Sequence, residues 1–234
     1  MAFHVEHGPD LLSPAPMTGE DSSQTARQLL VEGLDELPLA VTDHQLELLL
    51  DLSQLLHEWS KRINLTGHRT AAEIVRRLIL DAAALTAQLP EIASLADIGS
   101  GAGFPGFPVA ILRSECRVTL VESRERRHHF QRQVIRQLGL DNVRAELGRA
   151  ETLEPSIHAA AIAQAVAQPA DALPLLLPWV GSGGWMFFPG SVPPPPIPED
   201  DLRVRFEPCA TYQVPLGGPE RALWTARKVS ETSA

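Results

Sequence analysis

Apolar residues recur at helical spacing through the first third of the chain. Residues 42–45 have the spacing of a capping box, and leucines follow on one face of the predicted helix as far as Trp59. A second capping box at residues 70–73 opens a helix with apolar positions along 74–85. The pattern therefore predicts two amphipathic helices before the first strand. Residues 1–23 are rich in Pro, Gly, Ser and acidic residues without periodicity, and we expect a flexible tail there.

The pattern changes after residue 94, where short apolar runs alternate with helical stretches. Residues 95–98, 117–121 and 142–147 are typical of buried strands, and Phe130 and Val134 share the inward face of a helix between the last two. Strands separated by helices of this length imply right-handed βαβ units and a parallel sheet. The sequence therefore predicts an α/β fold.

The last third of the chain mixes short predicted strands with proline-rich segments. A helix over residues 170–179 is expected to be interrupted by Pro174. Residues 191–198, with the proline-rich run at 193–198, are expected to form an extended loop. The strands expected in this part cover residues 159–167, 184–188, 204–207, 211–214 and 222–227.

Composition narrows the class of protein. The formal net charge of −9 argues against a protein that coats nucleic acid through bulk electrostatics, although a local basic patch on an acidic body suffices for a selective enzyme. Arginines do cluster in the helix after the second predicted core strand: Arg124, Arg126, Arg127, Arg132 and Arg136.

The spacing of the cysteines and the hydropathy of the chain both favour a cytoplasmic protein. Cys116 and Cys209 are far apart and form neither a disulfide framework nor a zinc signature, so no metal site is expected. The first residues lack the pattern of a signal peptide, and no apolar run is long enough to span a bilayer. We therefore expect a cytoplasmic protein without membrane contact.

The most informative segment is the glycine-rich run at residues 99–103, directly after the strand at 95–98. Glycine permits positive φ and lets the backbone approach a ligand closely. Open α/β sheets bind nucleotides at such a turn, and Glu122 ends the next strand, where a carboxylate reaches ribose hydroxyls. These features together predict a nucleoside-cofactor site. The alternative is a tight turn with a Glu on the surface.

The spacing leaves two cofactors open. Gly101, Gly103 and Gly106 also fit the dinucleotide pattern G-x-G-x-x-G, but Pro105 lies where the phosphate-binding helix would begin. S-adenosylmethionine has no phosphate and does not need a helix dipole at this point. The run at residues 149–151, just after the third strand, is suited to holding an adenine. We therefore favour S-adenosylmethionine, although much of this preference rests on the family resemblance given next.

These segments resemble the small-subunit ribosomal RNA methyltransferase G family, also called glucose-inhibited division protein B. The matching runs are W-S-K-R-I-N-L-T at residues 59–66, D-I-G-S-G-A-G-F-P-G at 97–106 and T-L-V-E-S at 119–123. The resemblance covers residues 42–151 well and the remainder poorly. It implies a Rossmann-like class I methyltransferase fold with a mostly parallel seven-stranded sheet, helices on both faces and an N-terminal helical extension.

The resemblance also implies the organisation and the reaction. One methyltransferase domain would follow the tail, with helices over residues 24–90 and the cofactor-binding core over 91–234. The substrate would be 16S ribosomal RNA or the small ribosomal subunit, methylated at N7 of a guanine. Apart from the resemblance, we expect the enzyme to be a monomer. N7 carries a free lone pair, so the reaction needs positioning rather than a general base, and no catalytic residue is predicted.

Site residues follow from the glycine turn and from the resemblance. The residues expected to bind the cofactor are Gly99, Gly101, Gly103, Phe104, Glu122, Ala150, Glu151 and Gln164. The residues expected to contact RNA are Asn64, Arg77, Arg126, Arg127 and Arg149.

The chain departs from the family at five polar positions. An arginine of the family is replaced by Gln164, and a lysine before a glycine is replaced by Pro189. An expected His is Leu78, an expected Ser is Ala82, and an expected aspartate is absent from residues 158–161. These losses support an alternative, a catalytically silent binding module with a methyltransferase fold. A third hypothesis, an NAD-dependent oxidoreductase, is supported only by G-x-G-x-x-G and lacks an acid/base pair for hydride transfer.

Overall fold

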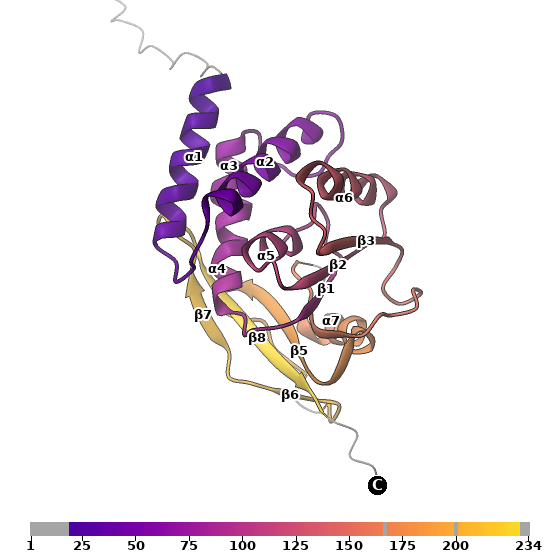
Figure 1. Ribbon diagram of the computed structural model, residues 1–234. Coiled ribbons are helices and arrows are strands. Elements are labelled where there is room, and N and C mark those ends of the chain that lie inside the picture. Colours follow the sequence, from indigo (N-terminus) through magenta and orange to yellow (C-terminus); the bar gives the residue numbers. More distant parts are fainter. Residues whose placement is uncertain (1–18, 166–167, 199–200, 230–234) are drawn as a thin grey trace, which may run out of the picture.

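The computed structural model describes residues 19–165, 168–198 and 201–229, which form one mixed sheet with helices on both faces (Figure 1). Five parallel strands run in the order β3-β2-β1-β4-β5, and β8 continues the sheet antiparallel to β5. Both β6 and β7 pair with β8. The strands are β1 (Ser94–Ile98), β2 (Arg117–Glu122), β3 (Val143–Leu147), β4 (His158–Ile162), β5 (Val180–Ser191), β6 (Val204–Phe206), β7 (Ala210–Gln213) and β8 (Glu220–Lys228).

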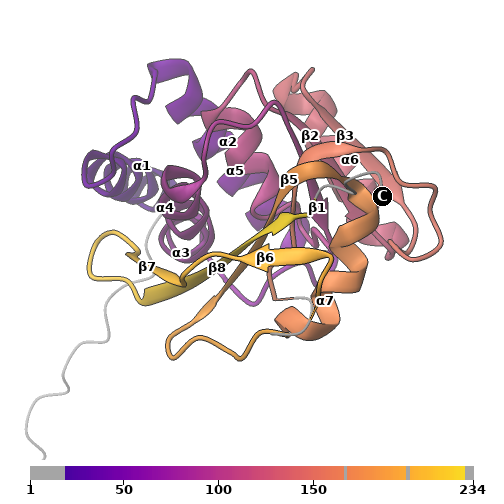
Figure 2. The ribbon, with the colours of Figure 1, turned by 90° about the horizontal axis from the view of Figure 1, so that it is seen from below.

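Helices cover the two faces of the sheet unequally, as Figure 2 shows. One face carries α4 (Leu80–Gln88), α5 (Gly106–Leu112) and α6 (Glu125–Leu138), and three further helical segments pack outside them. The opposite face carries α7 (Pro169–Leu176), which continues into the short helix η2 (Leu177–Trp179). The outer segments are α1 (Gly19–Asp35), α2 (Asp43–Ser60) and α3 (Ala71–Ile74).

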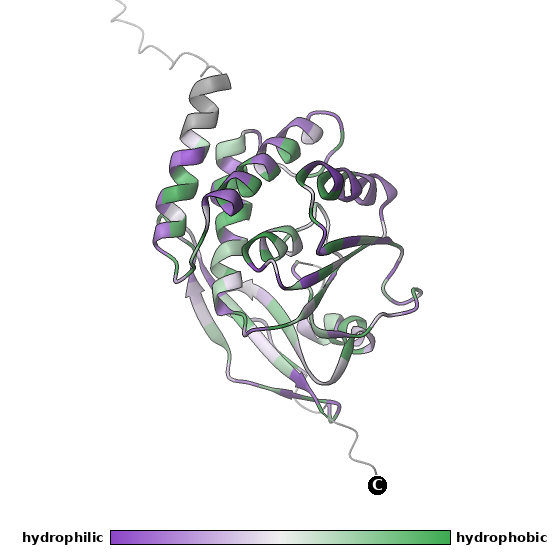
Figure 3. Cartoon of the chain, viewed as in Figure 1, coloured by the Kyte–Doolittle hydropathy of each residue, from purple (hydrophilic) through white to green (hydrophobic). Residues whose placement is uncertain are grey.

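Alternate residues of the central strands supply the two cores. Leu95 of β1 packs with α4 and α5, whereas its neighbours Ala96 and Ile98 pack with α7. Successive side chains of a strand point to opposite faces, so a sheet covered on both faces needs continuous apolar runs. Figure 3 shows apolar segments at the centre and polar ones on the outer face of α6.

The predicted helix starts agree with the structure. Thr42 caps α2, with its hydroxyl accepting from Gln45 N–H and its own N–H donating to the Gln45 side chain. Thr70 caps α3 through Glu73 N–H, but the Glu73 carboxylate accepts from Arg69 N–H, so the second box is only half formed. Between α3 and α4 the helix widens into one π turn, η1 (Val75–Ile79).

Helix α1 was not predicted as a separate element, although helices were expected over residues 24–90. It begins at Gly19, so the tail predicted over residues 1–23 is wrong at its end, and residues 1–18 lie outside the described part of the chain. Ala26, Leu30 and Leu34 are buried at a four-residue spacing. A Cβ on Gly33 would lie 2.5 Å from Leu80, so this glycine permits close packing against α4, although glycine is a poor helix former.

The C-terminal elements differ in extent from the prediction. The sheet has eight described strands rather than seven, because β6 and β7 both pair with β8. Pro174 lies within α7 instead of interrupting it, and the helix continues for two further residues. β4 ends at Ile162, whereas the strand was predicted to continue to residue 167; residues 166–167 lie outside the described part of the chain. No helix among the described residues combines the length and apolar character needed to cross a membrane.

Candidate functional site

The residues predicted to bind a cofactor lie after the carboxyl ends of four neighbouring strands. Gly99 follows β1, Glu122 ends β2, Ala150 follows β3 and Gln164 follows β4. The chain order reverses between β1 and β4, since β2 and β3 lie on one side of β1 and β4 on the other. Ligands of open α/β sheets bind at such a switch point. The predicted residues therefore meet at the position where this fold places a ligand.

The glycine turn is held by hydrogen bonds to its own backbone and to α6. Gly99, Gly101 and Gly103 have φ values of +70°, +60° and +88°, which glycine adopts without steric penalty. The fully buried Gln131 donates from Nε2 to Ser100 Oγ and to Gly101 O, both at 2.8 Å. A ligand would therefore meet a turn whose backbone is already ordered.

Space around the turn differs from one glycine to the next. A Cβ on Gly101 would have its nearest neighbour, Arg127 Nη1, at 3.7 Å, so the turn is open on that side. A Cβ on Gly103 would lie 2.1 Å from the ring of Phe107, so this glycine is required by packing. Gly101 thus leaves room for a ligand, and Gly103 closes the turn on α5.

Glu122 is buried and already accepts backbone hydrogen bonds. Its Oε2 accepts from Gly101 N–H at 3.0 Å, and its Oε1 accepts from Arg124 N–H at 2.7 Å. Arg127 Nη1 lies 3.8 Å from Oε2. A carboxylate has about four acceptor positions, and the Ser123 hydroxyl also donates to Oε1 at 3.5 Å, so Oε2 keeps a position for a further hydroxyl donor. The side chain therefore fits a hydroxyl of a ribose.

The buried side chain of Asp97 supports the glycine turn through a hydrogen bond. Its Oδ2 accepts from Gly106 N–H at 2.9 Å, and its Oδ1 is buried without a partner among the described residues. Burial raises the pKa of Asp97 to about 7; the Glu122 charge adds to this shift and the Gly106 hydrogen bond opposes it. The carboxyl group ties the end of β1 to the start of α5, and so orients the turn between them.

The other predicted cofactor residues surround the turn. Phe104 is half-buried and packs against the main core. After β3, Ala150 packs against the second core, and the neighbouring Glu151 is exposed. Gln164 is half-buried and lines a cavity of about 330 Å³ between the ends of β4 and β5. Pro189 lines the same cavity, so the departures at Gln164 and Pro189 face one space.

Basic and aromatic residues of α2 and α6 lie together around one surface hollow. The Trp59 ring lies 5.6 Å from that of His129 and 5.7 Å from that of Phe130. Arg126 and Arg132 line the surface hollow beside this contact, and both are exposed. The loop after α2 adds further polar and basic groups, namely Lys61, Arg62, Asn64, His68 and Arg69.

The remaining predicted RNA contacts do not lie in one cluster. Arg77 is exposed on η1, and Arg149 is exposed just after β3. Arg127 is only 30% exposed and faces Glu122 and Gly101 rather than open solvent. We therefore place Arg127 beside the predicted cofactor turn and Arg126 on the outer surface.

Sequence reasoning missed several polar residues of the site. Gln131 was not singled out, although a polar residue beside the inward-facing Phe130 is a signal of a buried hydrogen bond. The ion pair between Asp81 and Arg221 joins α4 to β8 at 2.5 Å, and 140 positions of sequence separate its partners. No local pattern could have predicted that pair.

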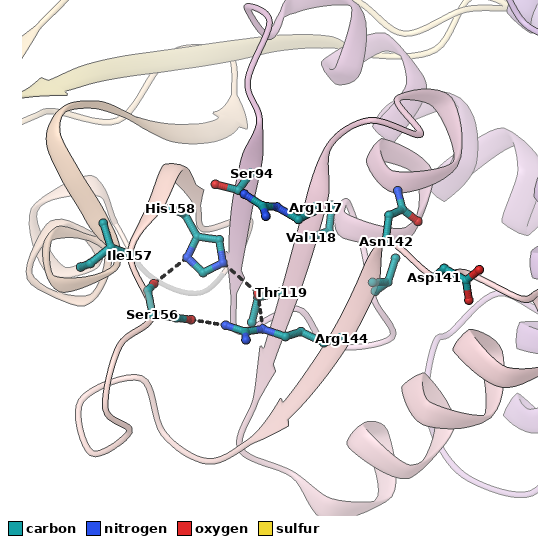
Figure 4. A pocket seen from close by; sticks show the side chains of 11 residues that line it. Ser94, Arg117, Val118, Thr119, Asp141, Asn142, Arg144, Ser156, Ile157 and His158 are labelled. Atoms are coloured by element: carbon teal, nitrogen blue, oxygen red, sulfur yellow. Dashed lines mark hydrogen bonds between the residues drawn. The ribbon is translucent and has the colours of Figure 1, made fainter.

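A second cavity, of about 360 Å³, lies at the opposite edge of the sheet, where β1 to β4 begin (Figure 4). Ser156 O can only accept a hydrogen bond, so His158 carries a proton on Nδ1, and in a neutral ring its Nε2 accepts from the Thr119 hydroxyl at 2.8 Å. That hydroxyl also accepts from Arg144 Nε at 2.9 Å. The Nδ1–H of His158 then donates to Ser156 O at 2.6 Å. Burial lowers the pKa of His158, and this network is satisfied with a neutral ring. We interpret it as structural.

Comparison with known proteins shows the family of this chain. Residues 45–217 match the rRNA small subunit methyltransferase G family. Two proteins named ribosomal RNA small subunit methyltransferase G are each 32% identical to this chain. That of Leptothrix cholodnii aligns over 86% of this chain and 95% of its own length, and that of Deinococcus radiodurans over 97% and 90%.

Solved structures share the fold. Cofactor-bound Rv0187 from MTB superposes with a TM-score of 0.55 at 14% identity, over 86% of this chain and 97% of that one. A provisionally assigned O-methyltransferase from Klebsiella pneumoniae superposes with a TM-score of 0.51 at 16% identity, over 76% and 90%. The predicted class I methyltransferase architecture is confirmed, apart from the strand number. With the family match over most of its length, the chain belongs to the rRNA small subunit methyltransferase G family.

Proposed function

We propose that this chain transfers the methyl group of S-adenosylmethionine to N7 of a guanine in 16S ribosomal RNA. One observation carries the proposal: Gly101, Glu122 and Ala150 lie at the carboxyl ends of adjacent strands in a chain of this family. Family membership over most of the chain favours this enzyme over a silent module or an oxidoreductase. The protein would act in the cytoplasm as a monomer, on the small ribosomal subunit or its RNA.

The residues of the turn account for cofactor binding. Glu122 accepts a hydrogen bond from a ribose hydroxyl, and the open side of Gly101 admits the nucleoside next to it. Ala150 offers an apolar surface after β3 for the adenine. S-adenosylmethionine supplies a methyl group on a sulfonium, whose sulfur keeps the bonding electrons when N7 bonds to the carbon.

Methylation of N7 needs few groups from the protein. The N7 lone pair is free in neutral guanine, so no side chain has to remove a proton before the attack. Holding the base in line with the methyl group and excluding water supply most of the rate enhancement. This requirement agrees with a site built mainly from backbone turns and buried hydrogen bonds, namely those of Gln131 and Glu122.

The basic surface on α6 supports RNA as the substrate. Arg126 and Arg132 are exposed beside Trp59 and His129, and aromatic rings stack on unpaired bases. Exposed arginines bind phosphates and release counterions, so binding should weaken as salt rises. Replacing both arginines by Glu should weaken binding to subunits and flatten its salt dependence; an unchanged slope would show that this surface does not contact RNA.

Labelled S-adenosylmethionine and small subunits that lack this methylation test the reaction directly. We expect label on a guanine of the 16S RNA, identified as 7-methylguanosine by nucleoside mass spectrometry. An ordinary member of the family is the positive control. Label from the control alone would overturn the proposed activity and leave the silent binding module.

A pair of glycine variants tests the position of the cofactor. Gly101→Trp fills the open side of the turn and should abolish S-adenosylmethionine binding in calorimetry. Gly139→Trp is a matched control, since its φ of +62° resembles the +60° of Gly101 and its Cβ would also meet open space, at the end of α6. Equal affinities in the two variants would place the cofactor elsewhere.

A further inference from the structure

The cavity between the ends of β4 and β5 lies next to the proposed methyl donor. Glu122 on β2 and Ala150 after β3 serve the ribose and the adenine, so the order β3-β2-β1-β4 leaves the β1 and β4 side for the reacting end of the cofactor. The cavity opens there, lined by Gln164 after β4 and Pro189 on β5. Its volume of about 330 Å³ lies in the range of sites for small organic groups.

Arg221 is the only Arg or Lys among the described residues that line this cavity. Its Nε and Nη2 both donate to Asp81 Oδ2, at 3.1 and 2.5 Å. Its Nη1 donates to no described residue, and the side chain remains 31% exposed. The guanidinium therefore has free N–H donors while one edge is held in place.

The partner of Arg221 is buried and fixed. Asp81 lies near the start of α4 with 7% of its side chain exposed, and its Oδ1 has no partner among the described residues. Tyr212, which pairs with Arg221 across β7 and β8, is also buried, and its hydroxyl has no described partner. Unsatisfied buried polar atoms are rare in folded proteins and mark positions where a ligand completes the hydrogen bonding.

We propose that Arg221, positioned by Asp81, donates a hydrogen bond to O6 of the target guanine and thereby selects guanine over adenine. The inference rests on the proposed function, since it assigns the base-reading residue of that site. Guanine carries O6, an acceptor, beside N7, whereas adenine carries an amino donor at the same position. An arginine that faces this edge therefore meets a partner on guanine and a repelling donor on adenine.

The charge of the pair suits the reaction. A methylated N7 leaves the guanine ring positively charged, and an isolated arginine would oppose that charge. The Asp81 carboxylate neutralises the guanidinium at 2.5 Å, so the pair presents N–H donors with no net charge. A bond to O6 also leaves the N7 lone pair free for the methyl group.

Replacing the target guanine by a base that lacks O6 tests this contact. Small subunits would be assembled with guanine or with 2-aminopurine at the target position, since 2-aminopurine keeps N7 and lacks O6. Wild type should methylate guanine about 10- to 100-fold more efficiently in kcat/KM. Arg221→Met should lower kcat/KM on guanine by that factor and leave 2-aminopurine within twofold, which removes the preference. Equal losses on both bases would overturn the inference and make the ion pair purely structural.

Further variants separate the contact from folding. Arg221→Lys keeps a hydrogen-bond donor and should retain part of the preference for guanine over 2-aminopurine. This variant tests the contact if Arg221→Met does not fold. A full wild-type preference in the Lys variant would overturn the inference. Asp81→Asn should reduce the preference for guanine while calorimetric affinity for S-adenosylmethionine stays within twofold; an unchanged preference would refute the positioning role.

The controls distinguish this inference from the proposed function. Arg203→Met breaks a comparable Arg–Asp pair, at 2.6 Å with Asp201, that lies outside the cavity lining, and it should change neither rate. Wild type that forms no 7-methylguanosine on guanine subunits would overturn the proposed function and this inference together. Wild type that forms it, with a preference insensitive to Arg221, would overturn this inference alone.

Discussion

The carboxyl group of Asp97 lies beneath the glycine turn and makes the free energy of unfolding depend on pH. The residue is 1% exposed, and among the described residues only one of its oxygens has a partner, the N–H of Gly106. Its pKa is raised from 3.8 to about 7, chiefly by burial. The folded protein therefore binds a proton at this site over a pH range in which the unfolded chain has released it.

That difference sets the sign and the magnitude of the effect. Between about pH 4 and pH 7 the folded state holds more protons than the unfolded state, so the free energy of unfolding falls as pH rises. A pKa difference of about 3 units, at about 1.4 kcal/mol per unit, lowers the free energy of unfolding by about 4 kcal/mol at pH values above 7. This is a large share of the ~5–15 kcal/mol by which domains are stable.

Asp97→Asn isolates this contribution, because the amide stays neutral and keeps an oxygen for Gly106 N–H. Urea unfolding of both proteins from pH 5 to pH 8 gives the difference in free energy of unfolding, in which other titrating groups cancel. We expect the variant to gain about 3 kcal/mol on the wild type between these limits, since two pH units of the effect lie above pH 5. Parallel stability curves would refute the reasoning.

Four further substitutions, one of them a control, test packing, a buried hydroxyl and helix capping by urea unfolding. Gly103→Ala places a Cβ 2.1 Å from the Phe107 ring at a φ of +88° and should lower the free energy of unfolding by about 3 kcal/mol. In the control Gly139→Ala the Cβ meets open space at a φ of +62°, and the loss should be about 1 kcal/mol; equal losses would contradict the packing argument. Tyr212→Phe removes a buried hydroxyl without a described partner and should stabilise the free protein by about 1 kcal/mol; destabilisation would mean that the hydroxyl is hydrogen-bonded. Thr42→Ala removes the hydroxyl that caps α2 and should cost about 1 kcal/mol; an unchanged free energy of unfolding would show that the cap contributes nothing.

The elements with local signals were predictable from the sequence. The capping box at Thr42 and the strand that runs into Gly99 each depend on residues within one short window. Helix α1 lacked such a signal, because its buried positions are few and its burial depends on the fit of Gly33 against Leu80. Its stability comes from tertiary packing, which a single sequence does not reveal.

The two halves of the site differ in the same way. Glu122 could be placed from its position in the second strand, because parallel βαβ units bring consecutive strand ends together. Arg221 could not, since its position depends on β8 pairing antiparallel with β5 and on an ion pair to Asp81 on α4. The proposed cofactor half of the site is thus local in sequence, whereas the cavity beside it is assembled from both ends of the chain.

The departures from the family pattern gain a physical meaning from this assembly. Gln164 and Pro189, where relatives are expected to carry Arg and Lys, both line the cavity that contains Arg221. Because both side chains are uncharged, the Asp81–Arg221 pair is the only ion pair at this cavity among the described residues. Attack by N7 leaves a positive charge on the base, so nearby cations destabilise the transition state. A cavity with fewer cations therefore opposes the reaction less. Loss of these two cations is therefore compatible with an active enzyme, provided that phosphate contacts are supplied by the arginines of α6.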